Sequence, residues 1–482
     1  MQTQVIIRIL GILLMIFSVA MFPPILIAWQ FGDGGGLAFF YAFLISLALG
    51  LILYFPRRDA RSELRTRDGF LVVILFWGVL SFMGAVPLYL GDISNFGFAD
   101  AIFESFSGLT TTGATVISGI DSLPHSILFY RQQLQWMGGM GIIVLAVAVL
   151  PMLGIGGMQL YRAETPGPVK DAKLTPRIAG TAKALWMIYL GLTVACALAY
   201  WGAGMSLFDA VSHSFSTVAI GGFSTHDASI GWFESTQIEL IASFFMLISG
   251  INFSLHFVAA RKLSLDSYFN DTEFRVYMGI LLAVIIIAII VLVAHEHFEF
   301  SEAVTKSIFH TISIGTTTGF SSSDFSAWPI FLPVLLLFIS FVGGCAGSTG
   351  GGMKVIRVLL LFKQGTREIK RLIHPNAMFK IRVGDNVITE KIVEAVWGFF
   401  SAYVVLFFFF MLIIMADGHD QITAFSAVAA CMNNLGPGLG DVVNNYSELS
   451  DLSKWVLSIA MLFGRLEIFT LLVLFSPDFW RS

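Results

Sequence analysis

Charge is what this 482-residue sequence has least of, since Asp, Glu, Lys and Arg together make up 12% of it. A soluble protein usually carries about 25% charged residues. Hydrophobic residues make up 56% of the chain. So few polar groups cannot cover a water-facing surface, which excludes a string of soluble domains. The sequence therefore predicts an integral membrane protein.

Positive charge and cysteine are also scarce. The 28 Lys and Arg residues are outnumbered by 32 Asp and Glu, for a formal net charge of −4, which excludes an overall basic nucleic-acid binder. The three cysteines lie in apolar or glycine-rich surroundings and do not form the even, spaced set of a disulfide framework. They are Cys196, Cys345 and Cys431.

Enzyme motifs are absent as well. The sequence contains no Walker A motif, no HExxH zinc motif and no GxSxG nucleophile motif, and few ionisable residues lie in its apolar runs. We therefore expect no enzymatic activity, no organic cofactor in this chain and no hydrolysis of ATP by it.

Long apolar runs are what the sequence does have. A helix needs about 20 apolar residues to cross the hydrocarbon core of a bilayer. Nine uncharged runs of that order are present, and a tenth is interrupted only by Arg465 and Glu467. The sequence predicts ten crossings, at Ile9–Gly32, Gly34–Pro56, Gly69–Gly91, Gln132–Tyr161, Ala184–Phe208, Leu240–Ala260, Val276–Ala294, Phe325–Met353, Ala395–Ala416 and Trp455–Pro477.

The basic residues between these runs indicate the orientation. Four segments, 57–67, 162–183, 261–275 and 354–382, hold 21 of the 28 Lys and Arg residues. The segments that alternate with them hold only Lys306. Cytoplasmic loops carry the excess of Lys and Arg, so the basic segments and both chain termini are predicted to be cytoplasmic.

Four outward segments are too apolar for ordinary loops, yet counting any of them as a full crossing would invert the basic loops that follow. We expect each to re-enter the membrane as a short helix and to return as extended chain, which requires that it be buried in protein or line a cavity. The segments are Ser105–Ile120, Ala210–His226, Ser307–Ser323 and Gln421–Gly440.

These four segments align as an internal repeat. Fourteen residues ending at a glycine read DAIFESFSGLTTTG, DAVSHSFSTVAIGG, KSIFHTISIGTTTG and TAFSAVAACMNNLG, and the first three share a serine six residues before the glycine. Each predicted unit holds a crossing, a re-entrant helix, a glycine turn and a second crossing. The predicted parts are two N-terminal helices with a basic loop (1–68) and four units (69–180, 181–272, 273–384 and 385–482).

The glycine turns suit the dehydration of a cation. A cation that enters a pore needs oxygen ligands in place of its water, and rings of backbone carbonyls provide them. Aligned carbonyls require an unusual φ and ψ, which glycine adopts without a clash. The predicted filter residues are Thr111, Thr112, Gly113, Ile220, Gly221, Gly222, Thr317, Thr318, Gly319, Asn434, Leu435 and Gly436.

At this point the sequence resembles the Trk/Ktr/HKT superfamily of potassium transporters, and most closely its bacterial TrkH-type branch. The resemblance spans essentially the whole chain and lies in FESFSGLTTTGATV, SFSTVAIGGFSTHD, GGCAGSTGGGMK, NNLGPGLG and MLFGRLEIF. It implies an all-α, potassium-channel-like pore of four M1–pore helix–M2 repeats, with potassium (or rubidium) preferred over sodium as the transported ion. The filter departs from the potassium-channel TVGYG sequence, because most repeats keep a single glycine.

The resemblance also implies partners and a location. It implies a homodimer with one pore per protomer in the bacterial cytoplasmic (inner) membrane. It further implies a cytosolic RCK-type ring that binds a nucleotide (NAD or ATP) and gates the pore.

A glycine-rich stretch marks a break in the second helix of unit three, because each glycine costs a helix up to about 1 kcal/mol relative to alanine. The resemblance implies an intramembrane gate below the filter, whereas the glycine spacing also fits close helix packing. A phosphate-binding P-loop is excluded because Met precedes Lys354. The stretch is Gly343, Gly344, Cys345, Ala346, Gly347, Ser348, Thr349, Gly350, Gly351 and Gly352.

Arg465 lies in the middle of the last apolar run. A charge in the membrane costs about 2.5–3.5 kcal/mol on insertion scales and usually faces a cavity or a partner. The resemblance places Arg465 in the conduction path as an electrostatic barrier, and the alternative is a purely structural partner. For the whole chain the alternative function is an ion-coupled secondary transporter of another small solute, although such folds often show twofold inverted repeats rather than four parallel units.

Overall fold

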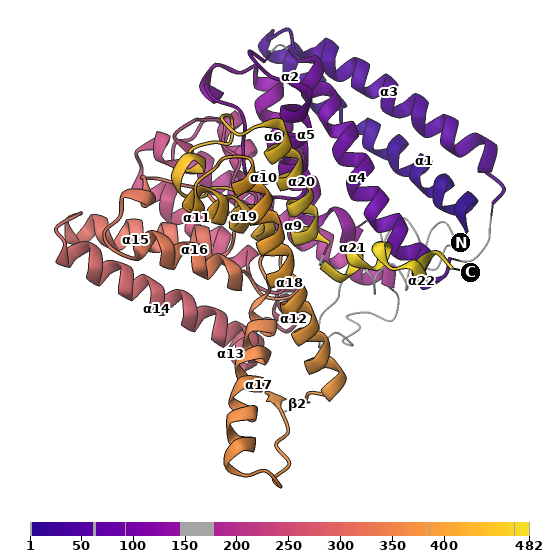
Figure 1. The fold of residues 1–482 in the computed structure, drawn as a ribbon. Coiled ribbons are helices and arrows are strands. Elements are labelled where there is room, and N and C mark those ends of the chain that lie inside the picture. Colours follow the sequence, from indigo (N-terminus) through magenta and orange to yellow (C-terminus); the bar gives the residue numbers. More distant parts are fainter. Residues whose placement is uncertain are drawn as a thin grey trace.

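The computed structural model describes residues 2–60, 64–91, 93–144, 178–384, 386–466 and 468–481 (Figure 1). The regular secondary structure of this part of the chain is helical apart from one antiparallel hairpin that pairs β1 (Arg382–Val383) with β2 (Asn386–Val387). The predicted all-helical class is confirmed. Glu467, and the predicted crossing Gln132–Tyr161 beyond Val144, lie outside the described residues.

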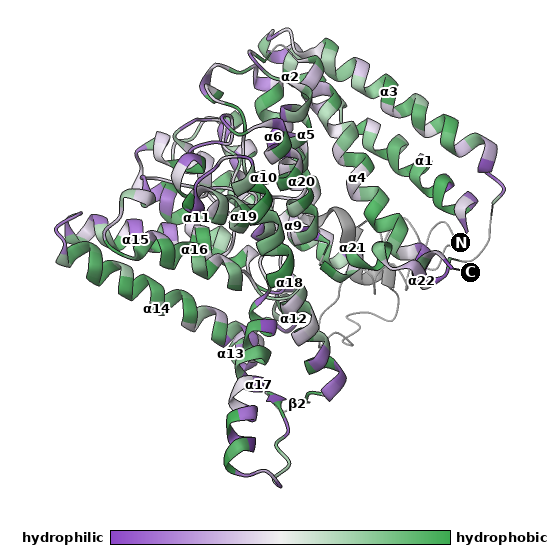
Figure 2. Cartoon of the chain, in the orientation of Figure 1, coloured by the Kyte–Doolittle hydropathy of each residue, from purple (hydrophilic) through white to green (hydrophobic). Residues whose placement is uncertain are grey.

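Six helical stretches in the described part are long and apolar enough to cross a membrane. They are Thr3–Phe31 (α1, Thr3–Val19, and α2, Phe22–Phe31), Gly36–Arg57 (α3, Gly36–Tyr54, and a 3-10 turn), Arg67–Leu90 (in α4, Thr66–Leu90), Lys183–Gly202 (in α9, Ile178–Gly202), Thr272–Ala294 (α14) and Glu390–Ala416 (α18). Most residues along these helices are hydrophobic (Figure 2). In α14, for example, Leu282, Ile286 and Ile290 are exposed on one stripe, which fits contact with lipid rather than water.

Three of the other predicted crossings are interrupted in the described part of the chain. α11 (Thr236–Ser249) and α12 (Phe253–Lys262) meet at an angle of 94°, and α20 (Asp451–Arg465) and α21 (Ile468–Phe475) at 114°. The 11-residue α16 (Leu332–Val342) ends at Gly343, and a non-helical loop leads from there to α17 (Val355–Ile373). The sequence predicted only the last of these breaks. At the α11–α12 bend, the Asn252 side chain accepts a hydrogen bond from the Ser254 N–H and starts a new helix inside an apolar run.

Four short helices pack among the long ones and overlap the predicted re-entrant segments, although the first three begin earlier in the chain than predicted. They are α5 (Phe98–Leu109), α10 (Leu207–Ala219), α15 (Phe300–Gly315) and α19 (Gln421–Asn433). Acidic or hydroxyl groups mark their N-termini, as where Ser206 caps α10 and Asp420 caps α19. Their C-terminal residues are buried almost completely.

The order of the helices places each short helix between a long helix and a second helix. The series run α4–α5–α6 (α6, His125–Val144), α9–α10–α11, α14–α15–α16 and α18–α19–α20. The N-terminal helices α1 and α3 pack against one another and beside α4, at the edge of the molecule (Figure 1). The short helices α13 (Asp266–Asn270) and α22 (Pro477–Trp480) complete the described helices.

Candidate ion-conduction site

The four short helices end in the same backbone turn. Two residues before each predicted filter glycine, a non-glycine residue has a φ between 53° and 69°, and the glycine itself has a φ between 79° and 94°. The residue between them donates its N–H to the carbonyl six residues before the glycine, at 2.7–2.8 Å. Non-glycine residues rarely adopt positive φ. The four turns therefore share one geometry, since a positive φ recurs at Thr111, Ile220, Thr317 and Asn434.

These turns close into a ring. The last glycine of each turn packs against one carbonyl oxygen of the following turn. That oxygen belongs to the residue just before the last glycine of the following turn. A β-carbon on the packed glycine would overlap the oxygen or, at Gly436, lie 2.8 Å from it. The contacts run from Gly113 to Gly221, from Gly222 to Thr318, from Gly319 to Leu435 and from Gly436 to Thr112. Because the last contact returns to the first turn, the structure brings all four predicted filter segments together.

The ring is chemically suited to a cation. Four helix C-termini lead into it, and each carries a partial negative charge of about half an elementary charge. Backbone oxygens gathered at one place can replace the water that a cation loses. A depression of about 320 Å³ lies on the outer side of the ring, and the four filter glycines are part of its lining.

Two side chains that were not anticipated from the sequence hold filter carbonyls. Gln135 on α6 donates from its amide to the carbonyl of Gly221 at 2.6 Å, and it also accepts the N–H of Phe223. Tyr446 donates its hydroxyl to the carbonyl of Gly436 at 2.7 Å. Gln135 lies 86 residues before Gly221, and Tyr446 lies 10 residues after Gly436. Only the fold makes these contacts visible.

The first and third turns are stabilised differently, by their own threonines. The hydroxyls of Thr110 and Thr112 lie 2.8 Å apart, and those of Thr316 and Thr318 lie at the same distance. The shared TTTG sequence of these two turns accounts for the match. The ring is thus fourfold in its backbone but alternates in its side-chain support.

Side chains on the short helices also hold the chain that follows each glycine. Nine residues before the glycine, Glu104 accepts the N–H of Val116 at 3.0 Å, His213 lies 2.9 Å from the Ser224 hydroxyl, and His310 lies 3.1 Å from the Ser323 hydroxyl. In the fourth unit a similar contact comes from Ser426 on α19, ten residues before Gly436, which donates to the carbonyl of Leu439. His213 and His310 thus each contact a serine that follows the glycine turn of their own unit.

Glu104 takes part in a fully buried ion pair. The Arg131 Nε lies 2.7 Å from its carboxylate, and both side chains are inaccessible to solvent. The same guanidinium donates to the carbonyl of Ser224 and lies 4.3 Å above the ring of Phe223. A buried charge survives only with such partners. Arg131 thus ties the first unit to the filter segment of the second.

The glycine-rich loop lies directly on the inner side of the ring. Gly351 donates its N–H to the Thr317 hydroxyl at 2.7 Å, and Gly352 donates to the carbonyl of Asn433 at 3.0 Å. Thr349 donates its hydroxyl to the carbonyl of Val218 at 3.0 Å. The loop therefore touches the ends of three of the four short helices.

Glycine is required here by close approach. A β-carbon on Gly351 would overlap the carbonyl oxygen of Asn433, and one on Gly350 would lie 2.8 Å from the carbonyl oxygen of Thr316. Gly343, Gly347 and Gly352 have positive φ. The glycines of the loop thus fit a close packing of loop against helix ends, rather than of helix against helix.

Arg465 joins this loop to the first unit. Its guanidinium donates to the carbonyl of Thr349 at 3.1 Å and to the carbonyl of Gly138 on α6 at 2.6 Å. It also lies 5.5 Å from the ring centre of Trp77. Contrary to the mid-helix position suggested by the sequence, Arg465 ends α20, where the helix path turns sharply.

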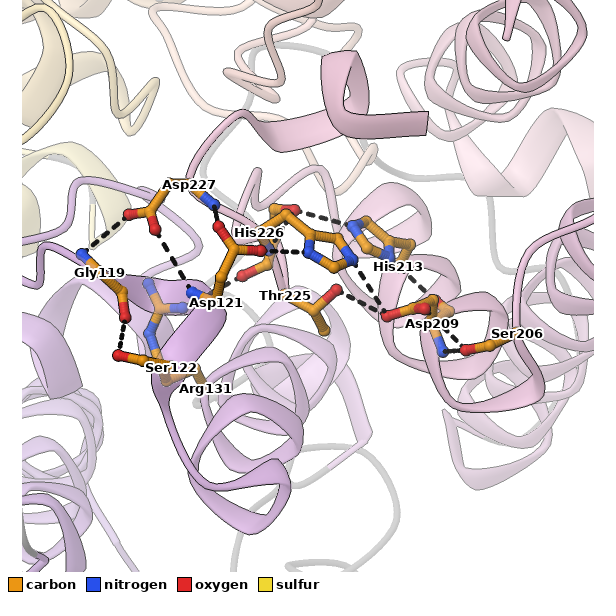
Figure 3. Close-up of polar contacts among 11 residues, drawn as sticks. Gly119, Asp121, Ser122, Arg131, Ser206, Asp209, His213, Thr225, His226 and Asp227 are labelled. Atoms are coloured by element: carbon orange, nitrogen blue, oxygen red, sulfur yellow. Dashed lines mark hydrogen bonds and ion pairs between the residues drawn. The ribbon is translucent and has the colours of Figure 1, made fainter. Parts of the chain in front are cut away.

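A polar cluster at the outer mouth links the first two units, and we call Asp121, Asp209, His226 and Asp227 the outer clasp (Figure 3). His226 lies 2.5 Å from Asp121 and 3.6 Å from Asp209, and it stacks on Trp232. Asp227 accepts the N–H groups of Gly119 and Asp121. Burial opposes the charged form of His226, but hydrogen bonds and charge from Asp209 and Asp121 outweigh it and raise the pKa of His226 above its ordinary value.

The stability contributed by His226 is expected to fall as the pH rises. A raised folded-state pKa gives stabilisation that is complete below the unfolded value of about 6.5 and is lost as the pH passes the folded value. The difference in thermal unfolding temperature between the unmodified protein and His226→Gln should therefore be larger at about pH 6 than at about pH 9. A difference that grows with pH would contradict a charged His226.

Comparison with known proteins places these observations in a family. A family model described as "Cation transport protein" (TrkH) matches residues 35–482. The chain is 58% identical to the Trk system potassium uptake protein TrkH of Vibrio parahaemolyticus and 56% identical to that of Escherichia coli K12, each over the full length of both chains. The crystal structure of the potassium transporter TrkH from Vibrio parahaemolyticus superimposes with a TM-score of 0.91 at 55% identity, covering 100% of both chains.

Proposed function

This chain belongs to the TrkH family of cation transport proteins, and from that membership we propose that it takes up potassium through the ring of four glycine turns. It is a multi-pass membrane transport protein and not an enzyme. The observation that carries the proposal is the closed ring, in which each filter glycine lies against the carbonyl of the next turn. A site of this kind selects a cation by replacing its water with backbone oxygen.

The pore is organised as four units in this proposal. Residues 69–180, 181–272, 273–384 and 385–482 each supply an M1 helix, a pore helix and an M2 segment, and residues 1–68 supply two further helices. The common turn geometry and the repeated helix order support this division. Potassium is the substrate at the filter residues.

The loop 343–352, together with Arg465, forms the gate in this proposal. The contacts of the loop with the ends of three short helices and with Arg465 support this assignment. Arg465 adds positive charge there, which opposes the passage of a cation. Conduction then requires the loop to leave the position seen in this structure.

Partners and location follow from the family. The relatives are components of a Trk system, so we infer that this chain works with partner subunits. We propose a homodimer with one pore per protomer, regulated by a cytosolic RCK-type ring that binds NAD or ATP. The membrane is the bacterial cytoplasmic membrane, with both termini on the basic, cytoplasmic side. The membrane potential supplies about 2.3 kcal/mol per charge per 100 mV for uptake.

The test is rubidium uptake into proteoliposomes that contain this chain alone, with potassium or sodium as competitor. We expect uptake that potassium blocks strongly and sodium blocks weakly. If the unmodified chain is closed, variants that open the gate should show the same ion preference. A folded, inserted protein that passes no rubidium, even with the loop removed, would favour an ion-coupled transporter of another solute.

A further inference from the structure

One carboxylate outside the ring and the loop holds the loop at two places. Glu273 lies in the first turn of α14 and is half-buried. Its Oε1 accepts the N–H of Ala346 at 2.7 Å and the N–H of Ile356 at 3.1 Å. Ala346 lies in the glycine-rich loop, and Ile356 is the second residue of α17, which follows the loop. A single oxygen atom thus joins both limbs of the loop to a different helix.

The contact with Ile356 also completes the start of α17. The first N–H groups of a helix have no partner within it, and a carboxylate there is favoured by the helix dipole. Val355 donates to the carbonyl of Gly344, and Arg357 donates to that of Lys354. Glu273 satisfies the N–H between them. α17 is therefore capped by a residue of another helix, and the cap is lost if the two separate.

The backbone between the two contacts is strained. Lys354 has a φ of 76°, which a non-glycine residue rarely adopts. Such a conformation persists only where its surroundings fix it. Ala346 lies before Lys354 and Ile356 after it, so the two hydrogen bonds to Glu273 hold the chain on both sides of the strained residue. The Lys354 ammonium also donates to the carbonyl of Gly350 within the loop.

We propose that Glu273 is a positioning residue that latches the loop in its closed position. The inference rests on the proposed gate. Because Glu273 stands at the end of α14 that follows α13, movement of this helix end is transmitted to the loop. Its carboxylate accepts hydrogen bonds from both limbs, and breaking them frees the loop and relieves the strain at Lys354.

The test measures the loop and the flux separately. Cys345 is buried beside Ala346 and is one of three cysteines. With Cys196→Ser and Cys431→Ser in the background, the rate of maleimide labelling of Cys345 reports release of the loop. Rubidium uptake by the same full-length chain in proteoliposomes reports the open pore. Glu273→Ala should raise both by about tenfold, because it removes the oxygen that accepts the N–H groups of Ala346 and Ile356.

Two further variants separate a latch from general damage. Glu273→Gln keeps an oxygen acceptor without the charge, so we expect it to rescue most of the closed behaviour. Asp271→Ala is the matched control, because Asp271 caps the same end of α14 through Phe274 but does not contact the loop in the hydrogen bonds described. We expect Asp271→Ala to leave labelling and uptake unchanged.

The outcomes are distinct. Unchanged labelling and uptake in a folded Glu273→Ala protein would overturn the latch, as would an equal rise in Asp271→Ala. Faster labelling of Cys345 without any uptake would uphold the latch and count against the loop as the gate. Faster labelling together with potassium-selective uptake would support both.

Discussion

Replacing Gly222 with serine is expected to remove most of the preference for potassium over sodium while the protein still folds and inserts. Gly222 has a φ of 83°, and a β-carbon on it would overlap the carbonyl oxygen of Thr318 in the next turn. The two turns must move apart, which alters the oxygen positions that replace water around the ion. A loss of about 1.4 kcal/mol in discrimination is a tenfold loss of selectivity. Competition by sodium against rubidium uptake measures it.

A matched glycine outside the ring provides the control. Gly204 also has a positive φ, of 103°, but no other atom lies within 4 Å of a β-carbon built on it. Gly204→Ser therefore adds backbone strain without a collision, and we expect its ion preference to match that of the unmodified protein. Gly436→Ser should be milder than Gly222→Ser, because the nearest oxygen lies 2.8 Å away instead of overlapping. Normal selectivity in Gly222→Ser would show that the ring does not discriminate between the ions.

The turns of the ring could be read from the sequence because their cause is local. A short helix that ends in a turn with positive φ needs glycine at a fixed place, and the four glycines share a register with their helices. The apolar runs likewise report the membrane directly. Both signals depend on neighbours along the chain, so a single sequence contains them.

The supports of the ring could not be read in this way. Gln135 contacts Gly221 across 86 residues, and Glu273 contacts Ala346 across 73. Such pairs depend on how the helices pack. The bends between α11 and α12 and between α20 and α21 were also missed, since an apolar run looks the same whether its helix is straight or broken. Asn252 was the available signal, as a capping residue within an apolar run.

The inner side of the ring shows why a charged residue is tolerated in the last apolar run. Arg465 ends α20, and its guanidinium donates hydrogen bonds to the carbonyls of Thr349 and Gly138. The first carbonyl belongs to the glycine-rich loop and the second to the Gly138–Gly139 pair. Near glycines no bulky side chain blocks the approach of the guanidinium to the backbone. Arg465 thus connects the loop to the first unit, and in the proposed pore it also puts a positive charge near the ion path.

Substituting Arg465 with alanine is expected to raise the basal uptake of rubidium by the chain without its partners. The change removes the two hydrogen bonds through which Arg465 connects Thr349 to Gly138, and it also removes a positive charge that repels cations. At an effective dielectric constant of about 20, a cation passing at about 8 Å is repelled by about 2 kcal/mol, which corresponds to a rate change of about thirtyfold. Deletion of Cys345–Gly351 should give a similar or larger rise. Uptake into proteoliposomes, normalised to inserted protein, measures both.

Arg465→Lys separates the two contributions. Lysine keeps the charge, but it lacks the planar fork that reaches two carbonyls at once. If Arg465→Lys shows uptake close to that of the unmodified protein, the barrier comes from the charge. If its uptake is close to that of Arg465→Ala, the barrier comes from the hydrogen bonds that hold the loop. Arg371→Ala is the control, because it removes a partly exposed positive charge on α17 that pairs with Glu368. Unchanged or lower uptake in a folded Arg465→Ala protein would exclude Arg465 from the gate and leave closure to the loop and its latch.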